Sequence, residues 1–347
     1  MNDSPSSQPI LISGAVGSPY TRKMLAILRY RRLPHRFLNS LSAEVRALPQ
    51  PPLPLLPCIY LSQPDVSYFA TSDSSVQLRT LEELSAERSI LPADPAIALL
   101  DRLVEDYADE WVTKLMFYYR WGIAENVENA AEMLVYWNIG ASEEQAEAFK
   151  RTFVPRQVGR LSGIVTGSLE ACGPILEASY ERLLHVLDER LRRRTFLWGT
   201  RPGASDFALQ GQLSQLFQVE PTSQRKAREI SRRVVAWVDT LDDLSGWQVE
   251  AGAGWVERAD LVADDRALFA EIGRTYAPFL LANARALDAG DEQMECSIDG
   301  QRYWQKCFRY QGKCLAWLRE AHTELSPTDR AFVDEQLGGT GCESIFA

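Results

Sequence analysis

The spacing of apolar and polar positions predicts a short mixed α/β segment at the start of the chain. Residues 10–13 and 58–61 are continuous apolar runs with the length of buried strands. Residues 35–39 are a third strand candidate, and apolar residues at helical spacing follow Ser18 as far as Pro34. A strand, a helix and a strand within about 30 residues favour a right-handed parallel unit.

Proline and helical periodicity shape the rest of this segment. Residues 46–57 are rich in proline, which regular elements do not tolerate, and are predicted to be a loop. Residues 66–70 are a further strand candidate, and residues 74–88 carry helical spacing. We therefore expect an α/β domain over residues 10–91, after a loose, disordered tail at residues 1–9.

From residue 96 onward the periodicity is helical almost throughout. Helices are predicted over 96–121, 126–137, 142–153, 168–194, 205–217, 225–243, 264–286, 303–322 and 328–337. The strand candidate in this part is 295–298. The segment LPADP at 91–95 is the predicted linker, so we expect an all-α domain over 96–245 and a helical extension packed on it over 246–347.

Composition and charge narrow the class of protein. The 347 residues, 46% hydrophobic and 24% charged, are typical of a globular protein with room for two domains. The net charge of −10 argues against a nucleic-acid partner, because phosphate binding depends on Lys and Arg. The basic runs at 29–32 and 190–194 lie in predicted helices and are interpreted as solvated faces.

The sequence shows no targeting, membrane or metal signal. The polar N-terminus lacks the apolar core of a secretory signal, and no apolar run approaches the ~18 residues of a membrane span. The six cysteines form no CxxC pair, and the three histidines offer no ligand spacing. We expect a reduced, cytoplasmic protein with no metal and no membrane partner.

Three short motifs place groups with binding chemistry at helix starts and beside a strand. Ser18 and the pair Asp73-Ser74 each open a predicted helix, whose free N–H groups and partial positive charge stabilise an anion. The pair Leu56-Pro57 stands directly before the strand predicted at 58–61. Each motif also has a purely structural interpretation, as a helix cap or a turn.

Taken in order, these motifs resemble one family. The stretches ISGAVGSPYTRKMLAIL, LPLLPCIYL and SDSSVQLRTLEEL, and more weakly FLWGTRPGASDFALQGQL, are similar to segments of the glutathione S-transferase family. The resemblance is to bacterial-type members with serine at the active-site position and an extended C-terminal helical domain. It covers residues 10–95 and continues weakly to residue 240. It implies a thioredoxin-like glutathione-binding domain followed by an all-α domain.

The resemblance assigns roles to the first two motifs. It implies that the Ser18 hydroxyl donates a hydrogen bond to the sulfur of glutathione and keeps it ionised, with Tyr20 or Thr21 as substitutes. It also implies that Pro57 follows a cis bond. The Leu56 backbone would then pair with the cysteinyl part of glutathione like an added strand.

The third motif is implied to hold the γ-glutamyl end of glutathione. Ser74 and the helix N-terminus would bind its carboxylate, and Asp73 its ammonium group. Asp73 replaces the commoner glutamate, and Gln77 stands where an aliphatic residue is usual, which predicts a loosened site. In the second domain, Gly203 and Asp206 match a capping box, which is a structural motif.

The resemblance also implies a second substrate and a reaction. Tyr118, Tyr119 and Trp121 are candidates for a pocket that takes an apolar substrate, although such aromatic residues are more often core. The implied function is enzymatic: glutathione, as co-substrate, attacks a small hydrophobic electrophile. A glutathione-dependent isomerase and a non-catalytic binding or assembly protein are the alternatives. The family further implies a homodimer.

Overall fold

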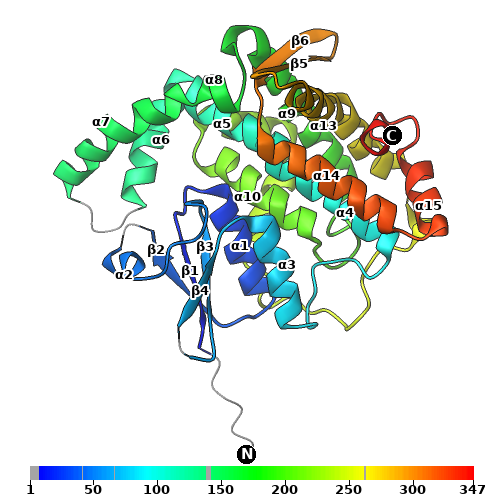
Figure 1. Cartoon of the computed structure of the whole chain (residues 1–347), viewed down its shortest axis with the longest axis horizontal. Coiled ribbons are helices and arrows are strands. Elements are labelled where there is room, and N and C mark those ends of the chain that lie inside the picture. The colour runs from blue at the N-terminus through cyan, green and yellow to red at the C-terminus, as the bar shows by residue number, and fades with distance from the viewer. Residues whose placement is uncertain (1–7, 41, 66, 138–141, 262) are drawn as a thin grey trace, which may run out of the picture.

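A four-stranded mixed sheet and a much larger helical body make up the protein (Figure 1). The computed structural model describes residues 8–40, 42–65, 67–137, 142–261 and 263–347. Residues 1–7 of the predicted tail lie outside this part of the chain. Among the described residues, no helix is long and apolar enough to cross a bilayer.

The sheet contains the predicted parallel unit and an antiparallel hairpin. Strand β1 (Ile10–Gly14) runs parallel to β2 (His35–Asn39), and α1 (Pro19–Tyr30) connects them. Strand β3 (Cys58–Ser62) pairs antiparallel with β1, and β4 (Tyr68–Thr71) pairs antiparallel with β3. The strand order is β2-β1-β3-β4, which is a thioredoxin-like arrangement. The predicted class of the N-terminal domain is therefore confirmed.

Two helices pack side by side against this sheet, α1 and α3 (Ser74–Leu84), while α2 (Ala43–Arg46) is a single turn after β2 (Figure 1). Ile12 of β1 pairs with Ile59 of β3, and both are buried in one core cluster with Leu78 of α3. Burial of each such side chain contributes about 1.5–3 kcal/mol. The sheet thereby fixes where the two helices begin.

Helices form almost all of the remaining described chain. The first group is α4 (Pro95–Tyr107), the π-helical turn η1 (Ala108–Val112), α5 (Thr113–Gly122), α6 (Ala124–Tyr136), α7 (Glu143–Gly159), α8 (Leu161–Ile164), α9 (Leu169–Leu191), α10 (Ala204–Gln218), α11 (Pro221–Ile230) and α12 (Arg232–Leu241). The second group is the 3-10 turn η2 (Arg258–Asp260), α13 (Ala263–Ala289), α14 (Arg309–Glu324), α15 (Pro327–Leu337) and α16 (Glu343–Phe346). The predicted all-α character of the domain after the sheet is confirmed.

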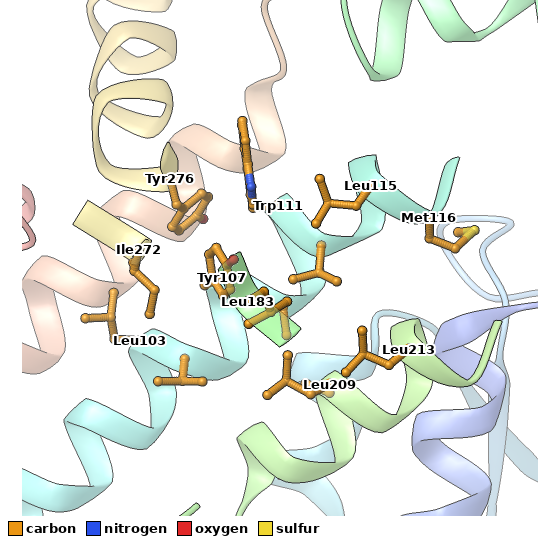
Figure 2. Close-up of a cluster of buried hydrophobic side chains, with 14 of the residues drawn as sticks. Leu103, Tyr107, Trp111, Leu115, Met116, Leu183, Leu209, Leu213, Ile272 and Tyr276 are labelled. Carbon is orange, nitrogen blue, oxygen red and sulfur yellow. The ribbon is translucent and has the colours of Figure 1, made fainter. Parts of the chain in front are cut away.

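The main core lies around α10, whose residues are all buried except Gln218. Figure 2 shows Tyr107 and Trp111 of the α4–η1 helix close to Tyr276 of α13, with Leu209 of α10 nearby. The rings of Tyr107 and Tyr276 meet edge to face, with centroids 6.1 Å apart. Because α10 also packs on α1, this core connects the helical body to the sheet domain.

The capping box predicted at the start of α10 is confirmed. The Gly203 N–H donates to Asp206 Oδ2 at 2.7 Å, and the Leu197 N–H donates to Oδ1 at 2.9 Å. Burial raises the pKa of the Asp206 carboxyl to about 7. The motif fixes the start of a fully enclosed helix, so its role is structural.

The helix predicted over 303–322 is wrong at its start. Residues 301–306 form strand β6 (Gln301–Lys306), which pairs antiparallel with β5 (Gln293–Ile298). Asp299 and Gly300 between the strands have φ of 54° and 72°, the left-handed pair of a two-residue hairpin turn. An Asp-Gly pair between two strands is the sequence signal for this turn.

The helix predicted over 225–243 and the two basic runs also need correction. Two helices, α11 and α12, replace the single one, because the Ser231 hydroxyl caps a new helix start. Arg31 and Arg190 belong to runs interpreted as solvated faces, yet both are buried and each pairs with a carboxylate. A buried guanidinium needs such a partner, and helical spacing alone does not reveal it.

Candidate functional site

A cavity of about 1120 Å³ opens between the thioredoxin-like domain and the helical body. Its lining includes Ser18, Tyr20, Leu56, Asp73 and Ser74, which were all predicted to meet glutathione. They come from the starts of α1 and α3 and from the loop before β3. The fold therefore brings three motifs that are well separated in the sequence to one cavity.

Ser18 stands at the start of α1, on the cavity wall. Its hydroxyl caps the helix by accepting a hydrogen bond from the Thr21 N–H at 3.3 Å, and Pro19 occupies the first helical position. The proton of this hydroxyl has no acceptor among the described residues and is available to a ligand. Pro19 has no N–H and the Thr21 N–H is already bonded, so it is mainly the partial positive charge of the helix start that favours an anion at the same point. Capping and ligand binding are thus compatible at Ser18.

The two residues named as substitutes for Ser18 have other roles. The Tyr20 hydroxyl donates to the Asp109 carbonyl at 2.8 Å and so joins α1 to the helical body. Burial raises the pKa of Tyr20 well above its usual range. Thr21 is fully buried beside Gly14 and does not line the cavity, which corrects its prediction as a glutathione contact.

The Leu56-Pro57 bond is cis, as predicted. Leu56 lines the cavity, and its backbone N–H and C=O form no hydrogen bond to any other described residue. The Pro57 carbonyl accepts a hydrogen bond from Gln77 Nε2 at 2.9 Å, and the same amide donates to the Thr71 carbonyl at 2.8 Å. Buried Gln77 therefore ties the loop, β4 and α3 together, while the loosening of the glutathione site stays a prediction.

Asp73 and Ser74 open α3 toward the cavity. Asp73 has a φ of 81°, a left-handed value that costs a non-glycine residue about 1–3 kcal/mol. Its Oδ1 accepts the Ser75 N–H at 3.1 Å, and its Oδ2 accepts the Tyr310 hydroxyl at 2.8 Å. Ser74 lines the cavity, although only 7% of its surface is exposed. A fixed carboxylate thus lies beside a helix start.

The C-terminal extension supplies part of the cavity wall. Phe308, Tyr310, Gln311 and Trp317 line the cavity from α14 and the residue before it, where α14 runs along α4 (Figure 1). Gln311 Nε2 donates to a Glu110 carboxylate oxygen at 3.1 Å. The sequence signal for this wall was the local abundance of aromatic residues, which does not indicate a partner.

The helical wall carries buried and partly buried titratable groups at the π-helical turn and directly before it. Lys23 Nζ lies 2.8 Å from a Glu105 carboxylate oxygen and 2.6 Å from one of Asp109, so it joins α1 to α4 and η1. Burial opposes the charge on Lys23, but the two carboxylates more than offset this and raise its pKa. Burial raises the pKa of Asp106 to about 6 and, with the charge of Asp106, that of Glu110 to about 8.

These acidic residues do not form a metal centre. Within the described part of the chain, no three side chains of His, Cys, Asp or Glu cluster as a metal ion requires. A π-helical turn inside an α-helix is frequent at functional sites. The turn here places Asp109 and Glu110 toward the cavity lining.

Of the three aromatic residues predicted to line a substrate pocket, Trp121 lines the cavity. Tyr118 and Tyr119 lie instead in the packing between α5 and α9. The Tyr118 hydroxyl donates to Glu177 at 2.7 Å, and the Tyr119 ring lies 5.1 Å from that of Tyr180 between centroids. The prediction is corrected for these two tyrosines because α5 turns one face to the cavity and another to α9.

No family model matches the chain, and no curated protein matches it in sequence. The solved structures similar to it are mostly described as glutathione transferases or transferase-like proteins. FzlA from C. crescentus is 17% identical with a TM-score of 0.43, and the match covers 73% of this chain and 98% of that one. The β-etherase LigF from Sphingobium sp. is 18% identical with a TM-score of 0.46, covering 68% and 95%.

A third similar structure is a glutathione S-transferase from Methylobacterium radiotolerans in complex with glutathione sulfonate. It is 19% identical with a TM-score of 0.37, and the match covers 70% of this chain and 98% of that one. Similarity at this level leaves function open, since one fold hosts many activities. The function therefore has to be inferred from the chemistry of the cavity.

Proposed function

We propose that the protein binds glutathione in this cavity and activates its thiol for attack on a small apolar electrophile. One observation supports this most strongly: the helix starts at Ser18 and Ser74 and the unpaired backbone of Leu56 line a single cavity. Glutathione carries a thiol, a carboxylate beside an ammonium group, and a peptide backbone between them. Each of the three features of the cavity suits one of these groups.

The start of α3 suits the γ-glutamyl end of glutathione. The Ser74 hydroxyl and the free N–H groups of the helix bind its carboxylate, since helix N-termini favour anions. The Asp73 carboxylate, held by the Ser75 N–H and the Tyr310 hydroxyl, pairs with the ammonium group. The Leu56 backbone then accepts the cysteinyl residue of glutathione as a short added strand.

The start of α1 suits the thiol. The Ser18 hydroxyl donates a hydrogen bond to the sulfur, and the helix start stabilises negative charge, so the pKa of the thiol falls and the thiolate forms. The sulfur then forms a bond to the electrophilic carbon, and the leaving group departs with the electron pair of the bond that breaks. Serine forms no mixed disulfide, so this position does not support thiol–disulfide exchange.

Calorimetric titration with glutathione tests binding, and thiolate absorbance against pH tests activation. We expect millimolar or tighter binding by the wild type, weaker binding by Ser74→Ala, and a raised pKa of the bound thiol in Ser18→Ala. Ser42→Ala is the matched control, because Ser42 caps α2 with the same 3.3 Å bond from a backbone N–H but lies outside the cavity lining. Absence of binding at millimolar glutathione would contradict the proposal.

Thiol counting after turnover distinguishes transfer from isomerisation. A transferase consumes one glutathione thiol for each product, whereas a glutathione-dependent isomerase returns it. We propose transfer and therefore expect thiol consumption with a chloroarene electrophile. The proposal includes a cytoplasmic homodimer, which sedimentation of the purified protein and localisation in cells would test.

A further inference from the structure

One wall of the cavity takes no part in holding glutathione in this proposal. It belongs to α5 and α7, which adjoin α6 at the left of Figure 1. Its side chains include four aromatic residues and two arginines, one in the last turn of α7 and one directly after it: Phe117, Trp121, Phe149, Phe153, Arg156 and Arg160.

The aromatic part is a continuous apolar surface. The Phe149 and Phe153 rings stack with centroids 4.4 Å apart. Trp121 lies 5.9 Å from Phe153 and 6.4 Å from Phe117 between ring centroids. The three phenylalanines are only partly buried. A ligand that covers them removes apolar area from water, which favours binding in proportion to that area.

Two arginines stand on this surface without an acidic partner. The Arg160 guanidinium lies 5.9 Å from the centroid of the Phe117 ring, and its Nη1 donates to the Gln157 amide oxygen at 3.1 Å. Arg156 is one helical turn away, and the described residues offer neither guanidinium a carboxylate at ion-pair distance. The pKa of Arg160 is lowered, first by burial and then by the like charge of Arg156. An anion placed between them would relieve this repulsion.

The acidic residues of the cavity already have donors from other elements. They are Asp73, Glu105, Asp106, Asp109 and Glu110. None of these donors comes from α7. In a chain with a net charge of −10, the α7 wall therefore offers positive charge next to a partly exposed aromatic surface.

We infer that the second substrate is an aromatic molecule with one anionic group, a carboxylate or a sulfonate. Arg156 and Arg160 hold the anionic group, while the aromatic body lies against Phe117, Trp121 and Phe153. The role as substrate rests on the proposed function, because the electrophile must reach the thiol at Ser18. The binding itself rests on the α7 wall alone.

Two fluorescent probes with the same aromatic body test this inference without glutathione. One is 8-anilinonaphthalene-1-sulfonate, and the other is N-phenyl-1-naphthylamine, which lacks the sulfonate. The Arg156→Gln/Arg160→Gln double variant should bind the anionic probe about tenfold more weakly, the loss typical of a charge-assisted contact, and the neutral probe unchanged. Arg151→Gln, also exposed on α7 but outside the cavity lining, should bind both probes as the wild type does.

Phe153→Leu separates the aromatic part from the charge. It should weaken the binding of both probes to a similar degree, because the same rings of each probe lie on this surface. Unchanged binding of the anionic probe by the double variant would overturn the inference. So would a double variant that loses glutathione binding alone, because the arginines would then hold the glycine carboxylate of glutathione. If the wild type binds no glutathione but keeps the preference for the anionic probe, the proposed function fails and the anion site stands.

Discussion

Two walls of one cavity differ in the kind of group they present. The thioredoxin-like wall offers hydroxyls and unpaired backbone at Ser18, Leu56 and Ser74. The helical wall offers titratable side chains, among them Asp106 and Glu110. Each group of the first wall is placed by residues a few positions away in the chain. The second wall is assembled by α4, η1 and an extension from the far end of the sequence.

The difference has an energetic consequence. A hydroxyl that caps a helix is already hydrogen-bonded, so it costs little to keep at the edge of a cavity. A buried carboxylate costs several kcal/mol unless a cation or donors offset the loss of water. Lys23, which belongs to α1 but is held by Glu105 and Asp109, joins the two walls. Removing a hydroxyl from the first wall should therefore change function. Removing Lys23, which joins the two walls, should instead lower the stability of the fold.

The largest expected effect is on stability, and it comes from removing Lys23. Lys23→Met leaves two carboxylates buried without their cation, so the free energy of unfolding should fall by about 3–5 kcal/mol. Urea denaturation measures the loss. Arg225→Met is the control, because Arg225 pairs with Glu125 at 2.9 Å on the exposed surface and should have a much smaller effect. If both variants lost the same free energy of unfolding, Lys23 and its two carboxylates would contribute no more to stability than an ordinary surface ion pair.

On the first wall, Ser18→Ala should affect catalysis more than stability. A hydrogen bond to a charged sulfur contributes about 1.5–3 kcal/mol, so kcat/KM with a neutral chloroarene should fall by roughly tenfold to a hundredfold. The free energy of unfolding should fall by only about 1 kcal/mol, the usual loss of a cap. Ser42→Ala should show the second effect without the first. If both variants keep full activity, Ser18 is a cap and nothing more.

The next largest effect is on glutathione binding, through the hydrogen bond between Tyr310 of the C-terminal extension and Asp73. Tyr310→Phe removes the donor to Asp73 Oδ2, so the carboxylate is less well fixed for the ammonium group of glutathione. A lost hydrogen bond of about 1 kcal/mol corresponds to roughly fivefold weaker glutathione binding by calorimetry. Tyr136→Phe, at an exposed tyrosine, should bind as the wild type does. Tighter binding in Tyr310→Phe would show that the extension competes with glutathione for Asp73.

The same contrast decides what could be read from the sequence. The strands, α1 and α3 follow from short apolar runs and from caps such as Ser18 and Asp73, because each signal lies within a few residues of its effect. The family resemblance of these short motifs indicated Ser18, Leu56 and Ser74, which line the cavity, and also Thr21, which does not. Gln77 shows the limit, since its hydrogen bonds to Pro57 and Thr71 depend on how three segments meet.

No short sequence pattern of this kind predicted which residues of the helical wall line the cavity. The hydrogen bond between Tyr310 and Asp73 joins residues 237 positions apart, and no local pattern specifies it. Helical spacing indicated that Tyr118 and Trp121 lie on a helix, but the neighbours of α5 decide that one meets α9 and the other the cavity. The hairpin at Asp299-Gly300 was different, because its turn signal followed a predicted strand, but the helical periodicity assigned to residues 303–322 hid the second strand.

The smallest expected effect is a pH dependence at the helical wall. Burial raises the pKa of Asp106 to about 6, above the value of about 3.9 in an unfolded chain. A raised carboxyl pKa means that the folded state holds the proton more tightly, so this contribution to stability is complete below about pH 4 and is lost as the pH rises through 6. Asp106 is partly exposed to the cavity, so water limits the loss to about 1 kcal/mol.

Asp106→Asn isolates this contribution, because the amide oxygen still accepts the hydrogen bond that the Tyr276 hydroxyl donates to Asp106 Oδ2 at 2.6 Å. Urea denaturation of the variant and the wild type should therefore give a difference in the free energy of unfolding that moves in favour of the variant between pH 4 and pH 7. A difference that stays constant, or that moves in favour of the wild type, would mean that Asp106 is as well solvated as the hydroxyls of the opposite wall. The contrast between a wall with buried titratable groups and a wall with capping hydroxyls would then rest on Lys23 and its two carboxylates alone.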